Sequence, residues 1–319
     1  MTVEAIGVDL GGTKMLVGVV DADRSVTYRS TAPSVGLTQV ELIATLEREL
    51  VAARDARGEV AAIGLGIPCT IDQERGLAVM AVNLELAHVP IRDLMRERLG
   101  LPVALDNDAN AAMLAEHRFG AARGADNAVM LTIGTGIGGG LVIGGDVYRG
   151  STGAGAELGH VVIEEDGPPC QGNCPNRGCV EALASGTAIA REGLAAAEAA
   201  PDSALGRAVA RRATLDGREV TDAALEGDPA AVGVLEKIGR RLGVALSSLA
   251  NVFAPDVMVI GGGAIRAGDL LLDPARHELA RRALEPMNRT PVAAAQLGPE
   301  AGMIGAATMA LLELDREIA

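Results

Sequence analysis

Residues 3–20 read VEAIGVDLGGTKMLVGVV, and residues 128–143 read AVMLTIGTGIGGGLVI. In each stretch an apolar run ends at a glycine-rich segment, and a second apolar run follows it. Such runs, rich in Val and Ile and interrupted by glycine, are typical of two buried strands joined by a tight turn. Because the pattern occurs twice, about 125 residues apart, it indicates an internal duplication and two similarly folded α/β halves.

The chain around these stretches predicts the other elements of each half. After the first stretch we expect a strand, a helix, two strands and a helix, at residues 26–31, 37–54, 61–67, 102–106 and 109–119. The glycine turn of the second stretch is expected at 134–140. After this stretch we expect a loop at 164–178, a mainly helical segment, a strand at 257–260 and a last helix at 301–314. Alternating strands and helices are typical of an α/β protein.

Length and composition favour two domains. A chain of 319 residues is long for a single core. We expect an N-terminal α/β domain at 1–122, a C-terminal α/β domain at 123–300 that contains the loop, and a helix at about 301–319 that packs back on the first domain. Apolar residues make up 49% of the chain and aromatic residues 1%, so the cores must consist of Ala, Val, Leu and Ile.

Charge and hydropathy exclude several classes of protein. The formal net charge of −14 argues against non-specific binding of nucleic acid, whose phosphates require Lys and Arg. It does not argue against a small phosphate site formed by backbone N–H groups. Since no apolar stretch reaches about 18 residues and no positively charged leader precedes the first strand, we expect a cytoplasmic protein with no membrane partner.

The first glycine turn has the composition of a phosphate site. Gly11 and Gly12 let the backbone approach a phosphate closely, Thr13 adds a hydroxyl, and Lys14 adds a positive charge. Asp9, at the end of the strand, could hold Mg²⁺ through water. The segment is not a P-loop, because the sequence G-x-x-x-x-G-K-[ST] is absent and no helix follows. The alternative is an ordinary glycine hairpin.

Two further glycine segments strengthen the phosphate interpretation. Thr135 and Gly136 lie in the second turn, and Gly261, Gly262 and Gly263 follow a third strand. The second turn is not a dinucleotide fingerprint, since strands flank it and no acidic residue follows a helix at the required distance. We expect the two turns to contact the phosphates of a nucleotide and the third segment its adenosine side.

Carboxylates and one histidine follow several of these strands. The segment Asp106–Asn110 follows a strand and begins a helix, so any of its first three residues could be an N-cap. Two carboxylates beside an Asn exceed what a cap requires, and one of them could accept a proton from an attacking hydroxyl. Glu157, His160 and Glu181 add polar groups of the kind that bind polyols.

His160 and three cysteines also predict a metal site. His160, Cys170, Cys174 and Cys179 have the spacing H-x9-C-x3-C-x4-C. One His and three Cys form a closed tetrahedral zinc set, which is typical of a structural site. The intervening loop has no core of its own and would be ordered by the metal. The alternative is three unrelated thiols, but clustered cysteines without an export signal favour metal over disulfide.

These motifs, in order and over nearly the whole chain, resemble those of the ROK family of bacterial sugar kinases and repressors, and within it the glucokinases. The matching segments are Asp9–Lys14, Gly64–Asp72, Asn83–Leu84, Asn107–Asn110, Thr135–Gly140, Glu157–His160, Gly178–Glu181, Ala184–Gly186, Pro255–Gly263 and Gly302–Ala307. The resemblance implies an actin-like ATPase fold, also called ribonuclease H-like, with two similar α/β domains around a cleft that binds ATP and sugar.

The resemblance also implies an activity and residue roles. The activity is ATP-dependent phosphorylation of a hexose, with glucose to glucose 6-phosphate as the leading reaction and Mg²⁺ and Zn²⁺ as cofactors. Asp108 would be the general base. The sugar ligands would be Asn83, Asn107, Asp108, Glu157, His160 and Glu181. His160 would serve the zinc with one ring nitrogen and the sugar with the other.

Three positions depart from the family pattern. Gly172 stands where the first cysteine of the metal motif is usual, and Cys170 lies two residues earlier. Cys69 replaces a glycine that lies close to sugar in the family. The Trp that usually follows the Asn-Leu segment is absent, and Leu86 or His88 stands nearby.

Other functions remain open at this point. A kinase for N-acetylmannosamine, fructose or allose has the same scaffold, and polyphosphate could replace ATP as the donor. A non-catalytic, sugar-responsive regulator of the same family would carry an N-terminal winged helix-turn-helix, for which the first strand at Val3 leaves no room. We expect a homodimer or homotetramer.

Overall fold

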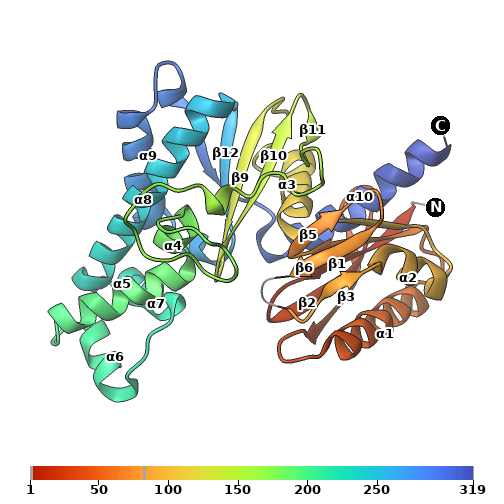
Figure 1. Ribbon diagram of the computed structural model, residues 1–319, viewed down its shortest axis with the longest axis horizontal. Helices are drawn as coiled ribbons and strands as arrows, with labels where there is room; N and C mark the ends of the chain where they lie inside the picture. Colours follow the sequence, from red (N-terminus) through yellow and green to blue (C-terminus); the bar gives the residue numbers. More distant parts are fainter. Residues whose placement is uncertain (1–2, 82–83, 319) are drawn as a thin grey trace. The chain divides into compact units, whose positions relative to one another are not determined.

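The computed structural model describes residues 3–81 and 84–318, with side chains to 316 (Figure 1). The chain divides into two compact units. Unit 1 contains Met1–Gly124, Gly140–Ala156 and Gln296–Ala319, and unit 2 contains Ala125–Gly139 and Glu157–Ala295. Among the described residues, no helix combines the length and the apolar character needed to cross a bilayer.

Unit 1 is built on a five-stranded sheet of order β3-β2-β1-β4-β8. Its strands are β1 (Glu4–Leu10), β2 (Lys14–Asp21), β3 (Val26–Pro33), β4 (Ala62–Ile67) and β8 (Val103–Asn107). The first three strands form an antiparallel meander, and β4 and β8 run parallel to β1. A second, three-stranded sheet of β5 (Cys69–Asp72), β6 (Leu77–Ala81) and β7 (Ala87–Val89) was not predicted from the sequence.

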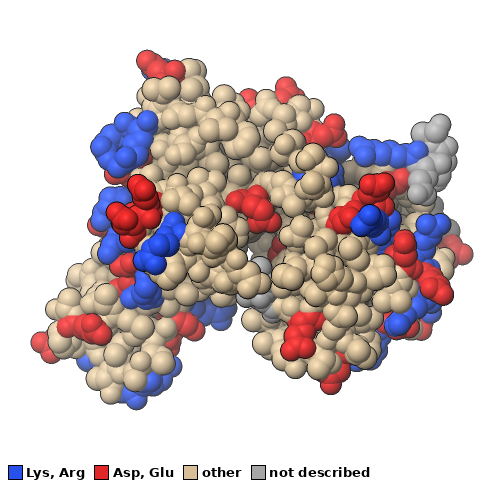
Figure 2. All heavy atoms as spheres, viewed as in Figure 1, with Lys and Arg blue, Asp and Glu red and all other residues tan. Residues whose placement is uncertain are grey.

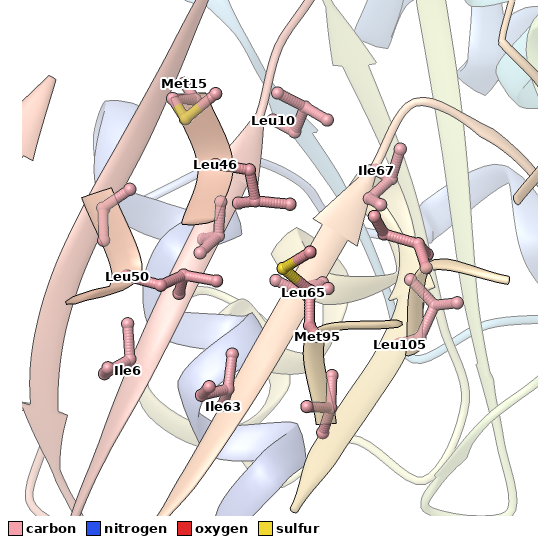
Figure 3. Close-up of a cluster of buried hydrophobic side chains, with 14 of the residues drawn as sticks. Ile6, Leu10, Met15, Leu46, Leu50, Ile63, Leu65, Ile67, Met95 and Leu105 are labelled. Carbon is pink, nitrogen blue, oxygen red and sulfur yellow. The ribbon is translucent and has the colours of Figure 1, made fainter. Parts of the chain in front are cut away.

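One face of the five-stranded sheet packs against α1 (Gln39–Arg57) and α2 (Ile91–Leu99). Figure 3 shows this core, in which Ile6, Ile63 and Leu65 of the sheet lie close to Leu46 and Leu50 of α1. These side chains are aliphatic and at most 2% exposed, so the apolar residues of the strands provide the burial that stabilises the unit.

The other face packs against α3 (Asp108–Phe119) and α10 (Ala301–Ile318). α10 approaches the strands so closely that side chains are excluded at the contact. A Cβ on Gly7 would lie 2.0 Å from the Met303 carbonyl oxygen, and one on Gly64 would lie 1.8 Å from that of Ala306. Glycines on adjacent strands therefore allow the backbone of α10 to lie against the sheet.

The second five-stranded sheet has the order β11-β10-β9-β12-β13. Its strands are β9 (Ala128–Ile133), β10 (Ile137–Ile143), β11 (Asp146–Val147), β12 (Val257–Gly261) and β13 (Val292–Ala294). In unit 1, β1 has its hairpin partner β2 on one side and the parallel strands β4 and β8 on the other. In unit 2, β9 has its hairpin partner β10 on one side and the parallel strands β12 and β13 on the other. This common order confirms the duplication predicted from the two glycine-interrupted stretches.

The second turn is shorter than predicted. β10 begins at Ile137 rather than at Leu141, so the turn contains only Gly134–Gly136. The three following glycines lie in the strand, and a Cβ on Gly140 would lie 2.6 Å from Cβ of Met113. Close packing against α3, rather than turn geometry, therefore accounts for Gly140.

The remaining helices lie in unit 2. They are α4 (Val180–Ala184), α5 (Gly186–Ala199), α6 (Ala204–Arg212), α7 (Gly217–Leu225), α8 (Pro229–Phe253) and α9 (Asp269–Arg282). α8 and α9 pack closely, because Gly239 and Gly243 of α8 lie against backbone carbonyls of α9. On the face shown in Figure 2, Lys and Arg side chains are interspersed with Asp and Glu, as on a typical solvated surface.

Candidate functional site

The first glycine turn (Gly11–Lys14) of unit 1 exposes two backbone N–H groups. The Gly11 N–H donates to the Lys14 carbonyl at 3.0 Å, and the Ser34 Oγ–H donates to the Gly11 carbonyl at 2.6 Å. Within the described residues the N–H groups of Gly12 and Thr13 have no hydrogen-bond acceptor. Adjacent free N–H groups form a concavity that binds anions. The turn therefore has the free donors that a phosphate site requires.

Asp9 ends β1 beside this turn. Its carboxylate lies against the first turn of α10, where a Cβ on Gly302 would come within 2.7 Å of it. Burial raises the pKa of Asp9 to about 7, the negative charge of Asp108 acts in the same direction, and Lys14 opposes both effects. A bound cation would favour the ionised form. Asp9 is therefore a suitable group to hold Mg²⁺ near the turn.

This pKa predicts how Asp9 affects stability. Because the folded-state pKa of about 7 exceeds the ordinary aspartate value of 3.8, the folded chain binds more protons than the unfolded chain between these values. The contribution of Asp9 to the free energy of unfolding is therefore present at low pH and is lost as the pH rises through about 7. Without Mg²⁺ or nucleotide, Asp9→Asn should have a higher Tm than wild type at pH 8, and the difference should shrink toward pH 5. A Tm difference that does not vary with pH would contradict this assignment.

The side-chain partners of Asp106, Asn107 and Asp108 distinguish the roles of these three residues at the end of β8 and the start of α3. Asn107 is the N-cap of α3, because its side-chain oxygen accepts from the N–H groups of Ala109 and Asn110. Asp106 is 1% exposed and is bound by Arg149 Nε at 2.6 Å and by Asn110 Nδ2 at 2.9 Å. These bonds give Asp106 a structural role. The general-base candidate is therefore the third residue, Asp108.

Asp108 is the first residue of α3 and is partly exposed. One of its oxygens accepts the Ala109 N–H at 2.9 Å. Cys69, 5% exposed, lies close enough that burial and the Asp108 charge together raise the pKa of its thiol to about 12. The Cys69 carbonyl lies 3.5 Å from Asn107 Nδ2. An uncharged thiol thus borders the Asp108 carboxylate.

The second glycine turn (Gly134–Gly136) of unit 2 repeats this arrangement. The Gly134 N–H donates to the Gly136 carbonyl at 2.9 Å. In the part of the chain that the structure describes, the N–H groups of Thr135 and Gly136 have no acceptor. Gly262, with φ of 82°, lies against the end of β9, since a Cβ on it would be 2.4 Å from the Ile133 carbonyl oxygen. The structure thus brings the second turn and the Gly261–Gly263 segment together.

The four predicted metal ligands also come together in unit 2. Their ligand atoms lie within 4.8 Å of one another. Cys170 Sγ is 3.5 Å from His160 Nδ1, and Cys174 Sγ is 3.9 Å from Cys179 Sγ. Tetrahedral zinc with bonds of about 2.3 Å to sulfur requires separations of about 3.8 Å. The four residues therefore fit a zinc ion, and Cys170 reaches the set despite its displaced position in the sequence.

Three predicted sugar ligands lie in unit 2, namely Glu157, His160 and Glu181, and His160 also belongs to the metal set. His160 turns Nδ1 toward the cluster, and Glu157 immediately precedes the short 3-10 turn Leu158–His160 and is exposed. Glu181 accepts the Ile137 N–H at 2.8 Å with Oε2 and lies 3.7 Å from Cys170 Sγ through Oε1. Glu181 therefore supports the second glycine turn in addition to any contact with sugar. Asn83 lies outside the described residues.

The metal assignment makes a direct prediction. We expect one zinc ion per chain by elemental analysis, because three sulfurs and one nitrogen close a tetrahedral set. Cys179→Ala removes a ligand that is fully buried, so it should abolish stoichiometric zinc and lower the Tm. Cys69→Ala is the matched control and should retain the zinc, since Cys69 lies outside the cluster. Wild-type zinc content in Cys179→Ala would exclude the assignment.

Comparison with known proteins gives consistent matches over nearly the whole chain. A model of the ROK family matches residues 5–313. The glucokinase of Streptomyces coelicolor is 38% identical over 315 residues, 96% of this chain and 96% of that protein. The glucokinase of Thermotoga maritima is 38% identical over 307 residues, 95% and 96% of the two chains. The crystal structure of a ROK family glucokinase from Streptomyces griseus in complex with glucose and AMPPNP has a TM-score of 0.87 at 37% identity, covering 97% of this chain and 99% of that chain.

Proposed function

This chain belongs to the ROK family, and from that premise we propose that it transfers the γ-phosphoryl group of ATP to a hydroxyl of a hexose, with glucose as the leading substrate. The observation that carries the proposal is the presence, within the described residues, of two glycine turns that each have two free adjacent N–H groups. The Asp108 carboxylate at the start of α3 supplies a candidate base. Similarity to glucokinases over the full length of the chain favours glucose.

Binding and activating the nucleotide requires positively charged or hydrogen-bond-donating groups around its phosphates, and little covalent chemistry by the protein. The free N–H groups of Gly12, Thr13, Thr135 and Gly136 would each donate to phosphate oxygens. Lys14 is exposed beside the first turn and would add a positive charge. Mg²⁺, held through Asp9, would neutralise charge on the phosphates. Gly261–Gly263 would accommodate the adenosine side, since Gly263 leaves open space where a Cβ would lie.

The sugar end needs orientation and a base. Asp108, at the start of α3, would accept the proton of the attacking hydroxyl. Asn107, Glu157, His160 and Glu181 would orient the other hydroxyls. His160 would use Nε2, because Nδ1 faces the metal ligands.

A coupled assay over a hexose panel tests the proposal. The purified chain would be assayed with glucose, N-acetylmannosamine, fructose and allose, each with ATP, GTP or polyphosphate. We expect the highest kcat/KM for glucose with ATP. A higher kcat/KM for another hexose or donor would overturn the substrate assignment and keep the kinase. No turnover with any combination would overturn the kinase itself.

A further inference from the structure

A residue of the metal loop contacts the second glycine turn directly. We define the metal loop as residues 164–178, between His160 and Cys179. Gln171, next to Cys170 in this loop, donates through Nε2 to the Ser185 hydroxyl at 3.0 Å and to the Thr135 carbonyl at 3.4 Å. Ser185 is fully buried and is the N-cap of α5. Gln171 thus connects the metal loop, the start of α5 and the turn.

The carbonyl groups of the turn are held by residues outside it. The Gly134 carbonyl accepts the Gly186 N–H at 2.8 Å. The Thr135 carbonyl accepts from Gln171 and also from Thr187 Oγ1 at 2.9 Å. Both carbonyls therefore have fixed directions.

The directions of the Gly134 and Thr135 carbonyls determine the directions of the two free N–H groups. The Gly134 carbonyl and the Thr135 N–H belong to one peptide group, and the Thr135 carbonyl and the Gly136 N–H belong to the next. In a planar trans peptide the C=O and the N–H point in opposite directions. A donor that holds the Thr135 carbonyl on one side therefore directs the Gly136 N–H to the other side.

We propose that Gln171 is a positioning residue that holds the Thr135–Gly136 peptide from the metal loop, so that the order of this loop sets the affinity for nucleotide. The inference rests on the proposed kinase function and extends it. The sequence predicts only that the metal orders this loop, whereas the bonds of Gln171 connect the loop to the second glycine turn. In this proposal Gln171 does not contact the nucleotide. It acts by holding the peptide group of the second glycine turn.

The test removes the donor and keeps the side-chain length. Gln171→Met should raise the Kd for AMPPNP, measured by calorimetry without sugar, by about three- to tenfold, as expected for one lost hydrogen bond. The KM for ATP should rise by the same factor, with the KM for hexose and the zinc content unchanged. Thr187→Val removes the other side-chain donor to this carbonyl and should act in the same direction. Asn176→Ala, an exposed residue of the same loop, is the matched control and should bind AMPPNP as wild type does.

The coupling to the metal has its own measurement. Removing zinc with a chelator should weaken AMPPNP binding in the wild type and weaken it less in Gln171→Met, since the variant has already lost this link. Equal AMPPNP affinity in wild type and Gln171→Met would overturn the inference while leaving the kinase intact. Failure of the wild type to bind AMPPNP at all would instead overturn the proposed function, so the two failures are distinguishable.

Discussion

Asp108→Asn should lower kcat by at least about 100-fold, with hexose binding largely retained. The amide keeps the size and the hydrogen bond to the Ala109 N–H, but it cannot accept a proton from the attacking hydroxyl. Steady-state kinetics would give kcat, and calorimetry with hexose would give Kd. A kcat near that of wild type would remove Asp108 from the role of base.

The neighbouring carboxylate supplies the matched control. Asp106 is buried and forms an ion pair with Arg149 at 2.6 Å. Replacing this carboxylate by an amide removes the buried charge that pairs with Arg149, whose side chain is 33% exposed, and weakens the hydrogen bonds from Arg149 and Asn110. Asp106→Asn should therefore lower the Tm, whereas Asp108→Asn should leave the Tm close to that of wild type. A large Tm loss in Asp108→Asn would indicate that this side chain, too, is structural.

Gly136→Val should abolish nucleotide binding. A Cβ on Gly136 would lie 2.2 Å from Glu181 Oε2, so the new side chain must displace the carboxylate that accepts the Ile137 N–H. The branched side chain would also fill the space in front of the free N–H groups. We expect no detectable binding of AMPPNP by calorimetry.

Gly134 provides a comparison within the same turn. A Cβ at this position meets nothing within 4 Å, so Gly134→Ala should change AMPPNP affinity far less than Gly136→Val. Because neither glycine has a positive φ, equal losses in the two variants would show that the turn tolerates a side chain at neither position. Unchanged AMPPNP binding in Gly136→Val would contradict the placement of phosphate at this turn.

The duplicated fold could be predicted because the strands that define it are long and almost wholly apolar. The segment between β4 and β8 could not. β5, β6 and β7 contain four, five and three residues, and their alternation is too short to distinguish strand from loop. Because glycine signals turns, the sequence predicts a turn over Gly138–Gly140, but contact with α3 places Gly140 inside a strand.

The metal ligands could be predicted because one His and three Cys at this spacing make up a complete tetrahedral set. The residue pattern alone could not separate Asp106, Asn107 and Asp108, because each can cap a helix and only the partners of each side chain distinguish them. The role of Gln171 could not be predicted from the sequence. A glutamine in a polar loop has no characteristic spacing, and its role depends on Thr135, which lies 36 residues away in the sequence.

Analysis of the reaction products tests the central claim most directly. The chain would be incubated with glucose, ATP and Mg²⁺, and the products followed by phosphorus NMR. We expect equal amounts of ADP and a hexose phosphate ester, with no inorganic phosphate. Unchanged ATP, or ATP converted to ADP and inorganic phosphate without a sugar phosphate, would contradict the proposal that the chain is a hexose kinase.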